Sequence, residues 1–234
     1  DGYIFTADTT NSRIYHSDLN SITSWTASNY ISVNISSDTL QLCAKHKSRI
    51  LGGGSNTIEM FFNAGNPSGS ILSSDKDALI NMGCLTSVTN INEYFFFIGS
   101  ATLNPGIWML SSNGVKKISS IVIDRYLSSS TFFSGTLSSI FYVGYTWLIF
   151  FAASGIRWFY CVELESWLET SFTSAIIGAS GTRRISNLDG PRFIASSTGK
   201  IYNWEGSPTY QDDGSAYTMT IQTEPKVLNK GKGF

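Results

Sequence analysis

The chain has 234 residues, which suits one large domain or two small ones and is enough to bury a substantial core. Charged residues make up only 14% of it and the formal net charge is −1, so no overall field draws it to nucleic acid or to an anionic membrane. We therefore expect no sequence-specific nucleic-acid binding. Aromatic residues reach 14% and small polar residues replace the missing charges, a composition that favours an all-β protein with many loops.

In chain order, the first predicted hairpin spans residues 2–18, where two apolar and aromatic segments flank a longer polar loop. Strand and hairpin patterns of this kind recur along the chain. No window of ten or more residues combines the helical repeat of apolar positions with a capping box. The sequence therefore predicts helices of single turns only.

Three consecutive glycines, Gly52 to Gly54, stand between two short apolar segments. A phosphate-binding loop would lead from such glycines into the start of a helix, and its most familiar form adds Lys-Ser or Lys-Thr. Here no such pair follows, and Ile58, Met60 and Phe62 fall on one face of a strand. We therefore predict a flexible bend or bulge between two strands.

The segment NEYFFFIGS, residues 92–100, is almost entirely apolar and predicts a strand buried on both faces. Residues 107–110 and 115–118 then form a predicted hairpin across Asn113 and Gly114. Asn-Gly is the dipeptide that most readily adopts the positive φ angles of a tight hairpin turn. A similar hairpin is predicted over residues 191–206, with Gly199 in its turn.

Residues 126–156 contain no charge, and the stretch 140–156 is long and apolar enough to suggest a transmembrane helix. The stretch is, however, dense in β-branched and aromatic residues and is interrupted by Gly144, Thr146 and Ser154. We interpret it as two neighbouring buried strands and predict no membrane span.

Units in which an aromatic strand is followed by an acidic turn and Trp recur at irregular spacings of roughly 40 to 50 residues, as in propeller blades. They end at Trp25 and Trp167, with looser versions around Trp108 and Trp204. The sequence predicts a β-propeller of roughly five to seven blades. A β-sandwich is the alternative, because the period is irregular.

No arrangement of residues indicates catalysis, a cofactor or a metal site. His16 and His46 have no nucleophile elbow or metal-ligand spacing around them, and nothing selects the carboxylate pair that glycoside hydrolysis needs. Cys43, Cys84 and Cys161 lie far apart and form no C-x-x-C motif, so they are expected to be small buried hydrophobes. We expect a protein that is not an enzyme.

The six Trp residues are expected to fill the space between packed sheets, although exposed Trp and Tyr would equally suit a propeller that binds carbohydrate or a host receptor. The basic clusters lie near the C-terminus and are interpreted as solvated, with weak potential for contact with a partner. They contain Arg183, Arg184, Lys226, Lys230 and Lys232.

From residue 17 onward the chain resembles the packaged-DNA stabilisation proteins of short-tailed bacteriophages. One matching motif has Trp25, Ala27 and Tyr30. A second contains His46, Arg49, Ile58, Glu59, Phe61, Phe62, Asn63, Gly65 and Asn66. Weaker matching segments follow in the same order as in the family. The chain departs from the pattern at Gly52 to Gly54, where the family tends to carry aromatic residues. Structural roles are expected for Trp25, Gly54, Glu59, Asn63, Gly65, Asn113, Gly114, Trp167 and Gly199.

The resemblance implies a structural virion protein, made in the host cytoplasm and built into the tail without a cofactor. Six copies in a ring below the portal would close the channel, retain the packaged DNA and dock other tail proteins. Because the family's members are about twice as long, residues 1–234 are expected to be one propeller-like domain within a longer chain. Residues 219–234 would begin a further strand or a linker.

Overall fold

A computed structural model describes residues 2–36, 38–101, 104–129, 135–142, 144–152 and 156–171, and the short segments 176–180, 192–195, 201–203, 211–212 and 215–216. This part of the chain is all-β apart from one helix, as the composition predicts. Its strands form antiparallel sheets in which consecutive strands pair as neighbours, and none of the sheets in the described part closes on itself.

The first sheet has three strands: β1 (Phe5–Asp8), β2 (Arg13–His16) and β3 (Tyr30–Ser32). The second has four: β4 (Leu40–His46), β5 (Arg49–Gly54), β6 (Ile58–Asn63) and β7 (Leu72–Ile80). The third also has four: β8 (Gly83–Ile91), β9 (Tyr94–Ala101), β10 (Asn104–Ser111) and β11 (Gly114–Lys117).

The fourth sheet contains β12 (Gly135–Tyr142), β13 (Tyr145–Ala152), β14 (Ile156–Cys161) and β15 (Ser166–Ser171). A three-stranded sheet follows, made of β16 (Ile176–Ser180), β17 (Arg192–Ala195) and β18 (Ile201–Asn203). The last pair is β19 (Gln211–Asp212) with β20 (Ser215–Ala216).

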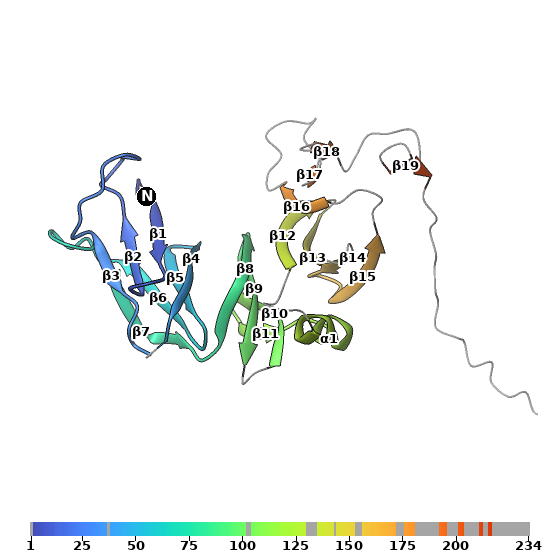
Figure 1. Cartoon of the computed structure of the whole chain (residues 1–234), viewed down its shortest axis with the longest axis horizontal. Coiled ribbons are helices and arrows are strands. Elements are labelled where there is room, and N and C mark those ends of the chain that lie inside the picture. Colours follow the sequence, from blue (N-terminus) through green and yellow to red (C-terminus); the bar gives the residue numbers. More distant parts are fainter. Residues whose placement is uncertain are drawn as a thin grey trace, which may run out of the picture.

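The first strands of successive sheets contact one another in chain order. β1 contacts β4, β4 contacts β8, β8 contacts β12, and β12 contacts β16. Figure 1 shows the sheets following one another along the molecule in the same order. Contact between the first strands of consecutive antiparallel sheets is the arrangement found around the axis of a propeller.

The apolar segments at 95–98 and 148–152 are buried on both faces, because alternate side chains enter different layers of the core. In β9, Phe95 and Phe97 face the second sheet, whereas Phe96 and Ile98 face the fourth. The stretch 140–156 likewise comprises the end of β12, all of β13 and the start of β14. This confirms the prediction of neighbouring strands, and in the described part of the chain no helix is long and apolar enough to cross a membrane.

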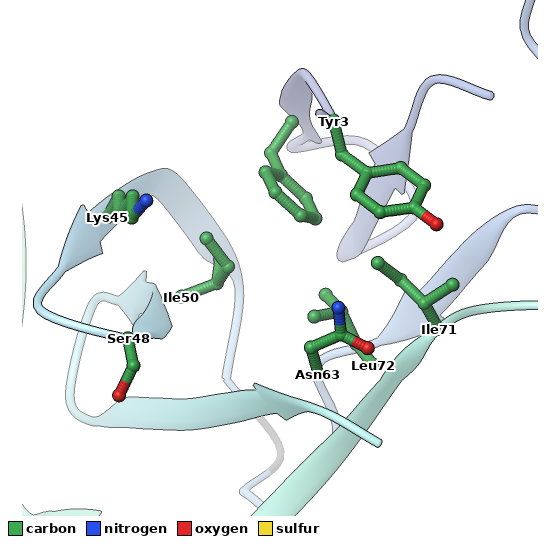
Figure 2. Close-up of a pocket in the computed structure, with 8 residues that line it drawn as sticks. Tyr3, Lys45, Ser48, Ile50, Asn63, Ile71 and Leu72 are labelled. Carbon is green, nitrogen blue, oxygen red and sulfur yellow. The ribbon is translucent and has the colours of Figure 1, made fainter. Parts of the chain in front are cut away.

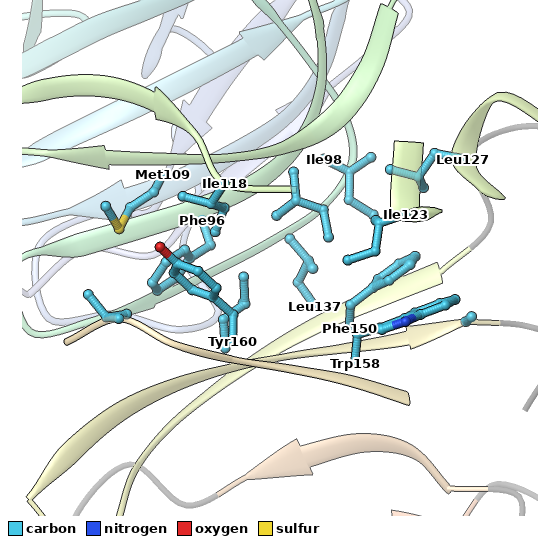
Figure 3. Packing of buried hydrophobic residues seen from close by; sticks show 14 of the residues in the cluster. Phe96, Ile98, Met109, Ile118, Ile123, Leu127, Leu137, Phe150, Trp158 and Tyr160 are labelled. Atoms are coloured by element: carbon cyan, nitrogen blue, oxygen red, sulfur yellow. The ribbon is translucent and has the colours of Figure 1, made fainter. Parts of the chain in front are cut away.

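Each pair of neighbouring sheets among the first four shares a separate apolar layer. Between the first and second sheets lie Ile14, Val33, Leu40, Ile50, Phe61 and Leu72. Between the second and third lie Leu51, Ile58, Cys84, Phe95, Phe97 and Leu110. The layer between the third and fourth, in Figure 3, includes Phe96, Ile98, Met109, Leu137, Phe150, Trp158 and Tyr160.

The prediction of single-turn helices is wrong, because α1 spans Ile121–Ser129. Ile123 and Leu127, four residues apart, bury their side chains in the layer between the third and fourth sheets. At the start of the helix, Ser120 accepts hydrogen bonds from the backbone N–H groups of Ile123 and Asp124. The helix has only nine residues, so it is too short to show the helical repeat of apolar positions over ten or more residues.

The three glycines were predicted to form a flexible bend or bulge between two strands; they lie inside a strand and not at a bend, and a register shift in the paired strand lies opposite them. Gly52, Gly53 and Gly54 are buried in the second half of β5 and pair with β4, whose register shifts between Leu40 and Leu42. A Cβ on Gly53 would lie 2.8 Å from the Cβ of Cys84 in the third sheet. The glycines therefore allow neighbouring sheets to approach closely.

The hairpin across Asn113 and Gly114 is confirmed, with Ser111 paired to Gly114. Its turn differs from the expectation, because only Gly114 has a positive φ, at 98°. This conformation fits a turn that ends on a single left-handed glycine rather than one with two positive φ angles.

Candidate assembly surface

The loop of residues 17–29, which joins β2 to β3, is organised by the carboxylate of Asp18. Ser24, Thr26 and Asn29 all donate side-chain hydrogen bonds to it. These bonds, with that from Ser24 the largest contribution, lower the pKa of Asp18 below its usual value. Backbone bonds from Asp18 to Ser24 and from Asn20 to Gly2 fix the loop further. The loop is therefore held in one conformation by its own polar groups.

This ordered loop presents three large apolar side chains to solvent. Leu19 is 59% exposed, Ile22 is 76% exposed and Trp25 is 40% exposed. The indole N–H of Trp25 donates to the carbonyl of Ile22 at 3.3 Å, so its polar atom is already bonded within the loop. We call these three residues the apolar tip. Trp25 thus does not fill a space between sheets, the role the sequence suggested for it.

The crossover from β3 to β4 is held by two acidic side chains, at its residues Ile35, Ser36 and Asp38. Glu59, only 1% exposed, accepts backbone N–H bonds from Ile35 at 2.7 Å and from Ser36 at 3.2 Å. Asp38, within the crossover, reaches in turn to the loop between β5 and β6. These contacts place Glu59 in an anchoring position between the first and second sheets.

The residues after the three glycines do bind an anion, and it is a carboxylate of the same chain. Asp38 accepts backbone N–H bonds from Ser55, Asn56 and Thr57. A Cβ on Gly54 would overlap the carboxylate of Asp38, so glycine is required there. Concave groups of successive N–H donors are typical anion sites, and Asp38 fills this one, which leaves no room for phosphate.

Asn63 and Gly65 form the turn that leaves β6. The side-chain carbonyl of Asn63 accepts the N–H of Gly65 at 2.9 Å, and Gly65 has a φ of 66°. Figure 2 shows Asn63 at a small cavity that is also lined by Tyr3 and Lys45. The cavity has a volume of about 60 Å³, enough for a few water molecules and far below the size of a typical ligand site.

Trp167 joins the fourth sheet to the segment before α1. Its indole N–H donates to the carbonyl of Ile118 at 2.6 Å, and the centroids of its ring and the Tyr160 ring are 5.0 Å apart. Gly199 and the predicted basic contacts lie outside the described residues, namely Arg183, Arg184, Lys226, Lys230 and Lys232.

The β4–β5 hairpin contains a cluster of basic residues that was not among the predicted sites, although it is visible in the sequence as AKHKSR, residues 44–49. Lys45, Lys47 and Arg49 lie within five residues. Arg49 forms an ion pair with Asp75 on β7, which neutralises part of this charge. Within the described ranges, no cluster of His, Cys, Asp and Glu is arranged to hold a metal ion.

Comparisons with known proteins place the chain in a family. None of the curated proteins compared with it matches. One matching solved structure, described as the complex of the fission yeast SREBP-SCAP binding domains, is 12% identical and covers 86% of this chain, with a TM-score of 0.37. The chain spans 57% of that protein's length, and the TM-score is too low to establish a shared fold. A family model described as "Bacteriophage P22 Gp10, beta-propeller" matches residues 1–140, and the chain therefore belongs to this phage stabilisation family.

Proposed function

We propose that the chain is a structural protein of a short phage tail that retains packaged DNA in the virion. In this role it assembles below the portal as a ring of several copies, six by family resemblance, closes the channel and docks other tail proteins. The observation that carries the proposal is the family match over residues 1–140. These residues include the whole of the first three sheets and the ordered loop at 17–29.

We assign the sheets as propeller blades within one domain over residues 1–234. Five sheets of three or four strands in the described part, with their first strands in contact in chain order, support at least five blades. Residues 219–234, assigned as a strand or linker leading into a longer chain, lie outside the described residues.

The use of the acidic residues supports a structural rather than an enzymatic role. Asp18 and Asp38 hold loops through several hydrogen bonds each. Both carboxylate oxygens of Glu163 accept the backbone N–H of Thr146 at 2.9 Å. A glycosidase would instead direct two carboxylates toward a substrate from opposite sides.

DNA retention in reconstituted particles tests the proposal. DNA-filled heads from a phage that lacks this protein are mixed with the purified full-length protein, and nuclease-protected DNA is measured over time. We expect protein-dependent protection and restored infectivity. Equal DNA loss with and without the protein, under conditions in which it joins the particle, would overturn the proposed function.

The exposed ring of Trp25 favours a second candidate, a propeller that binds carbohydrate or a host receptor. Sugar recognition also needs free polar groups beside the aromatic face. The polar neighbours in this loop, Asp18 and Asn29, are hydrogen-bonded to each other. Binding of purified protein to a glycan array, lost in Trp25→Ala, would establish this alternative.

A further inference from the structure

We propose that β1 is the second strand of its blade, and that its free edge pairs with one further strand of the same polypeptide, the segment that precedes the turn at Gly2. A free strand edge exposes unpaired N–H and C=O groups, so another strand is the partner that satisfies it. The inference goes beyond the proposed function, because it concerns how the first blade is completed and not what the tail retains.

The first step is the size of the first sheet. It has three strands in the order β1-β2-β3, whereas the second, third and fourth sheets have four strands each. Among the described residues, β1 pairs with β2 alone, and β3 likewise pairs with β2 alone. A fourth strand therefore has two possible places, beside β1 at the propeller axis or beside β3 at the periphery.

The second step is the length of the connections between strands. In the second, third and fourth sheets, two residues separate the first strand from the second. Four residues, 9–12, separate β1 from β2, so this connection does not match. The long connection in the second sheet, residues 64–71, lies between its third and fourth strands, and the long connection 17–29 lies between β2 and β3. By this comparison β2 is a third strand and β3 is a fourth.

The third step is the position of β3. It contacts β7, which is the last strand of the second sheet, and it leads into the crossover to β4 just as β7 leads to β8. The contact of β1 with β4 suits a second strand, because the second strands β5, β9 and β13 contact the first strands of the next sheets, β8, β12 and β16 respectively. The place for a further strand is therefore on the axis side, beside β1.

The fourth step is the turn before β1, which selects the occupant. In the next three sheets, the turn between the first and second strands contains a residue with a positive φ: Lys47 at 53°, Asn92 at 52° and Gly144 at 80°. Gly2 has a φ of 80° and precedes β1. Asp-Gly, the pair at residues 1 and 2, is a dipeptide favoured in tight hairpin turns. A strand that enters through this turn runs antiparallel to β1 along its free edge, so we assign this strand and neither a distant segment nor a second copy.

The fifth step identifies the backbone groups that the strand satisfies. The carbonyl of Ile4 accepts the N–H of Ser17 at 2.9 Å, so the pairing with β2 continues to Ile4. Hydrogen-bonded pairs alternate along an antiparallel ladder, and the next such pair on β1 is at Thr6. The N–H groups of Phe5 and Ala7 therefore point away from β2, toward the free edge.

Amide hydrogen exchange in the full-length protein, read residue by residue by NMR, tests the inference. Thr6 is the internal control, because its N–H is bonded to β2 in either case. We expect the amides of Phe5 and Ala7 to exchange at rates within about tenfold of that of Thr6, as in a strand paired on both edges. Exchange more than about tenfold faster than that of Thr6 would overturn the inference, because a free edge leaves alternate amides in contact with water.

Nuclear Overhauser contacts from the same two amides identify the paired strand. Contacts with residues that precede Gly2 in the same molecule support the inference. Contacts with any later segment of the chain would overturn the assignment. So would contacts seen only between molecules, in a sample that mixes isotope-labelled and unlabelled protein, because they would indicate a second copy. Neither readout depends on DNA retention, so a failure of the proposed function leaves both unchanged.

Discussion

Asp38 accepts the backbone N–H of Thr57 at 2.8 Å, and this bond ties the crossover between the first two sheets to the loop between β5 and β6. The same carboxylate also accepts the N–H of Asn56 at 2.7 Å. One side chain thereby accepts hydrogen bonds from backbone N–H groups of the turn that neither β5 nor β6 can pair. The turn after β5 consequently depends on a residue that is distant in sequence.

Removing this carboxylate should destabilise the fold. Asp38→Ala leaves the donors of Ser55, Asn56 and Thr57 without their acceptor, and we expect a loss of about 1–3 kcal/mol in the free energy of unfolding, reduced by the partial exposure of the site. Urea denaturation monitored by Trp fluorescence measures it. Asp77→Ala, at an exposed position of β7, serves as the control. An equal effect of the two substitutions would contradict the anchoring role.

Stability should fall in acid because of the same group. Burial alone would raise the pKa of Asp38, but the bonds from Ser55, Asn56 and Thr57 outweigh burial and lower that pKa below 3.8. A lowered carboxyl pKa contributes stability that is fully present above the unfolded value and is lost as pH falls through the folded value. Melting temperatures between about pH 5 and about pH 2 should therefore drop less steeply in Asp38→Asn than in the wild type.

Gly53 should tolerate a side chain less well than Gly52. A Cβ at Gly53 would lie 2.8 Å from the Cβ of Cys84, whereas the nearest neighbour of a Cβ at Gly52 would be the ring of Phe61 at 3.2 Å. We expect Gly53→Ala to cost about 1–3 kcal/mol, because the second and third sheets must separate, and Gly52→Ala to cost less. Thermal denaturation of the two variants checks the order, and the reverse order would contradict the close approach of the sheets.

The strands of this protein could be predicted from sequence because burial on both faces leaves a local pattern. The run at Phe95–Phe97 and the hairpin ending at Gly114 are visible in consecutive residues, and the structure confirms both. The series of sheets also followed from the recurrence of such units. The pattern did not reveal the short helix α1. Only Ile123 and Leu127 of this helix are buried, and two apolar positions are too few to show a helical repeat in the sequence.

The candidate surface was less predictable because its determinants are distant in sequence. Asp38 fills the N–H site after Gly54 from 17 residues away, so the glycines alone pointed to a bend. Similarly, Trp25 is 40% exposed on a loop that Asp18 cross-links through hydrogen bonds, and no local pattern indicates this. Aromatic content predicts packing on average but does not reveal which ring remains exposed.

Cys84 should be inert in the folded protein. It is 1% exposed between the second and third sheets, and burial raises the pKa of its thiol to about 12. Because the thiolate is the reactive form, we expect Cys84 to react with a thiol reagent at about pH 8 only after unfolding. Colorimetric thiol titration should detect all three cysteines in denaturant and fewer in native buffer. Cys84→Ser should leave the rapid native reaction unchanged, and a decrease would contradict the buried position.

Glu59 should be replaceable by Gln but not by Ala. Its Oε1 accepts the N–H groups of Ile35 and Ser36, and the carbonyl of Gln can accept the same bonds in the same space. Glu59→Ala removes both bonds and leaves a cavity beside the crossover, for an expected loss of about 2–4 kcal/mol. Glu59→Gln should lose less than half of this, because it keeps both accepted hydrogen bonds. Chemical denaturation distinguishes the two, and equal losses would contradict the role of these accepted hydrogen bonds in joining the first and second sheets.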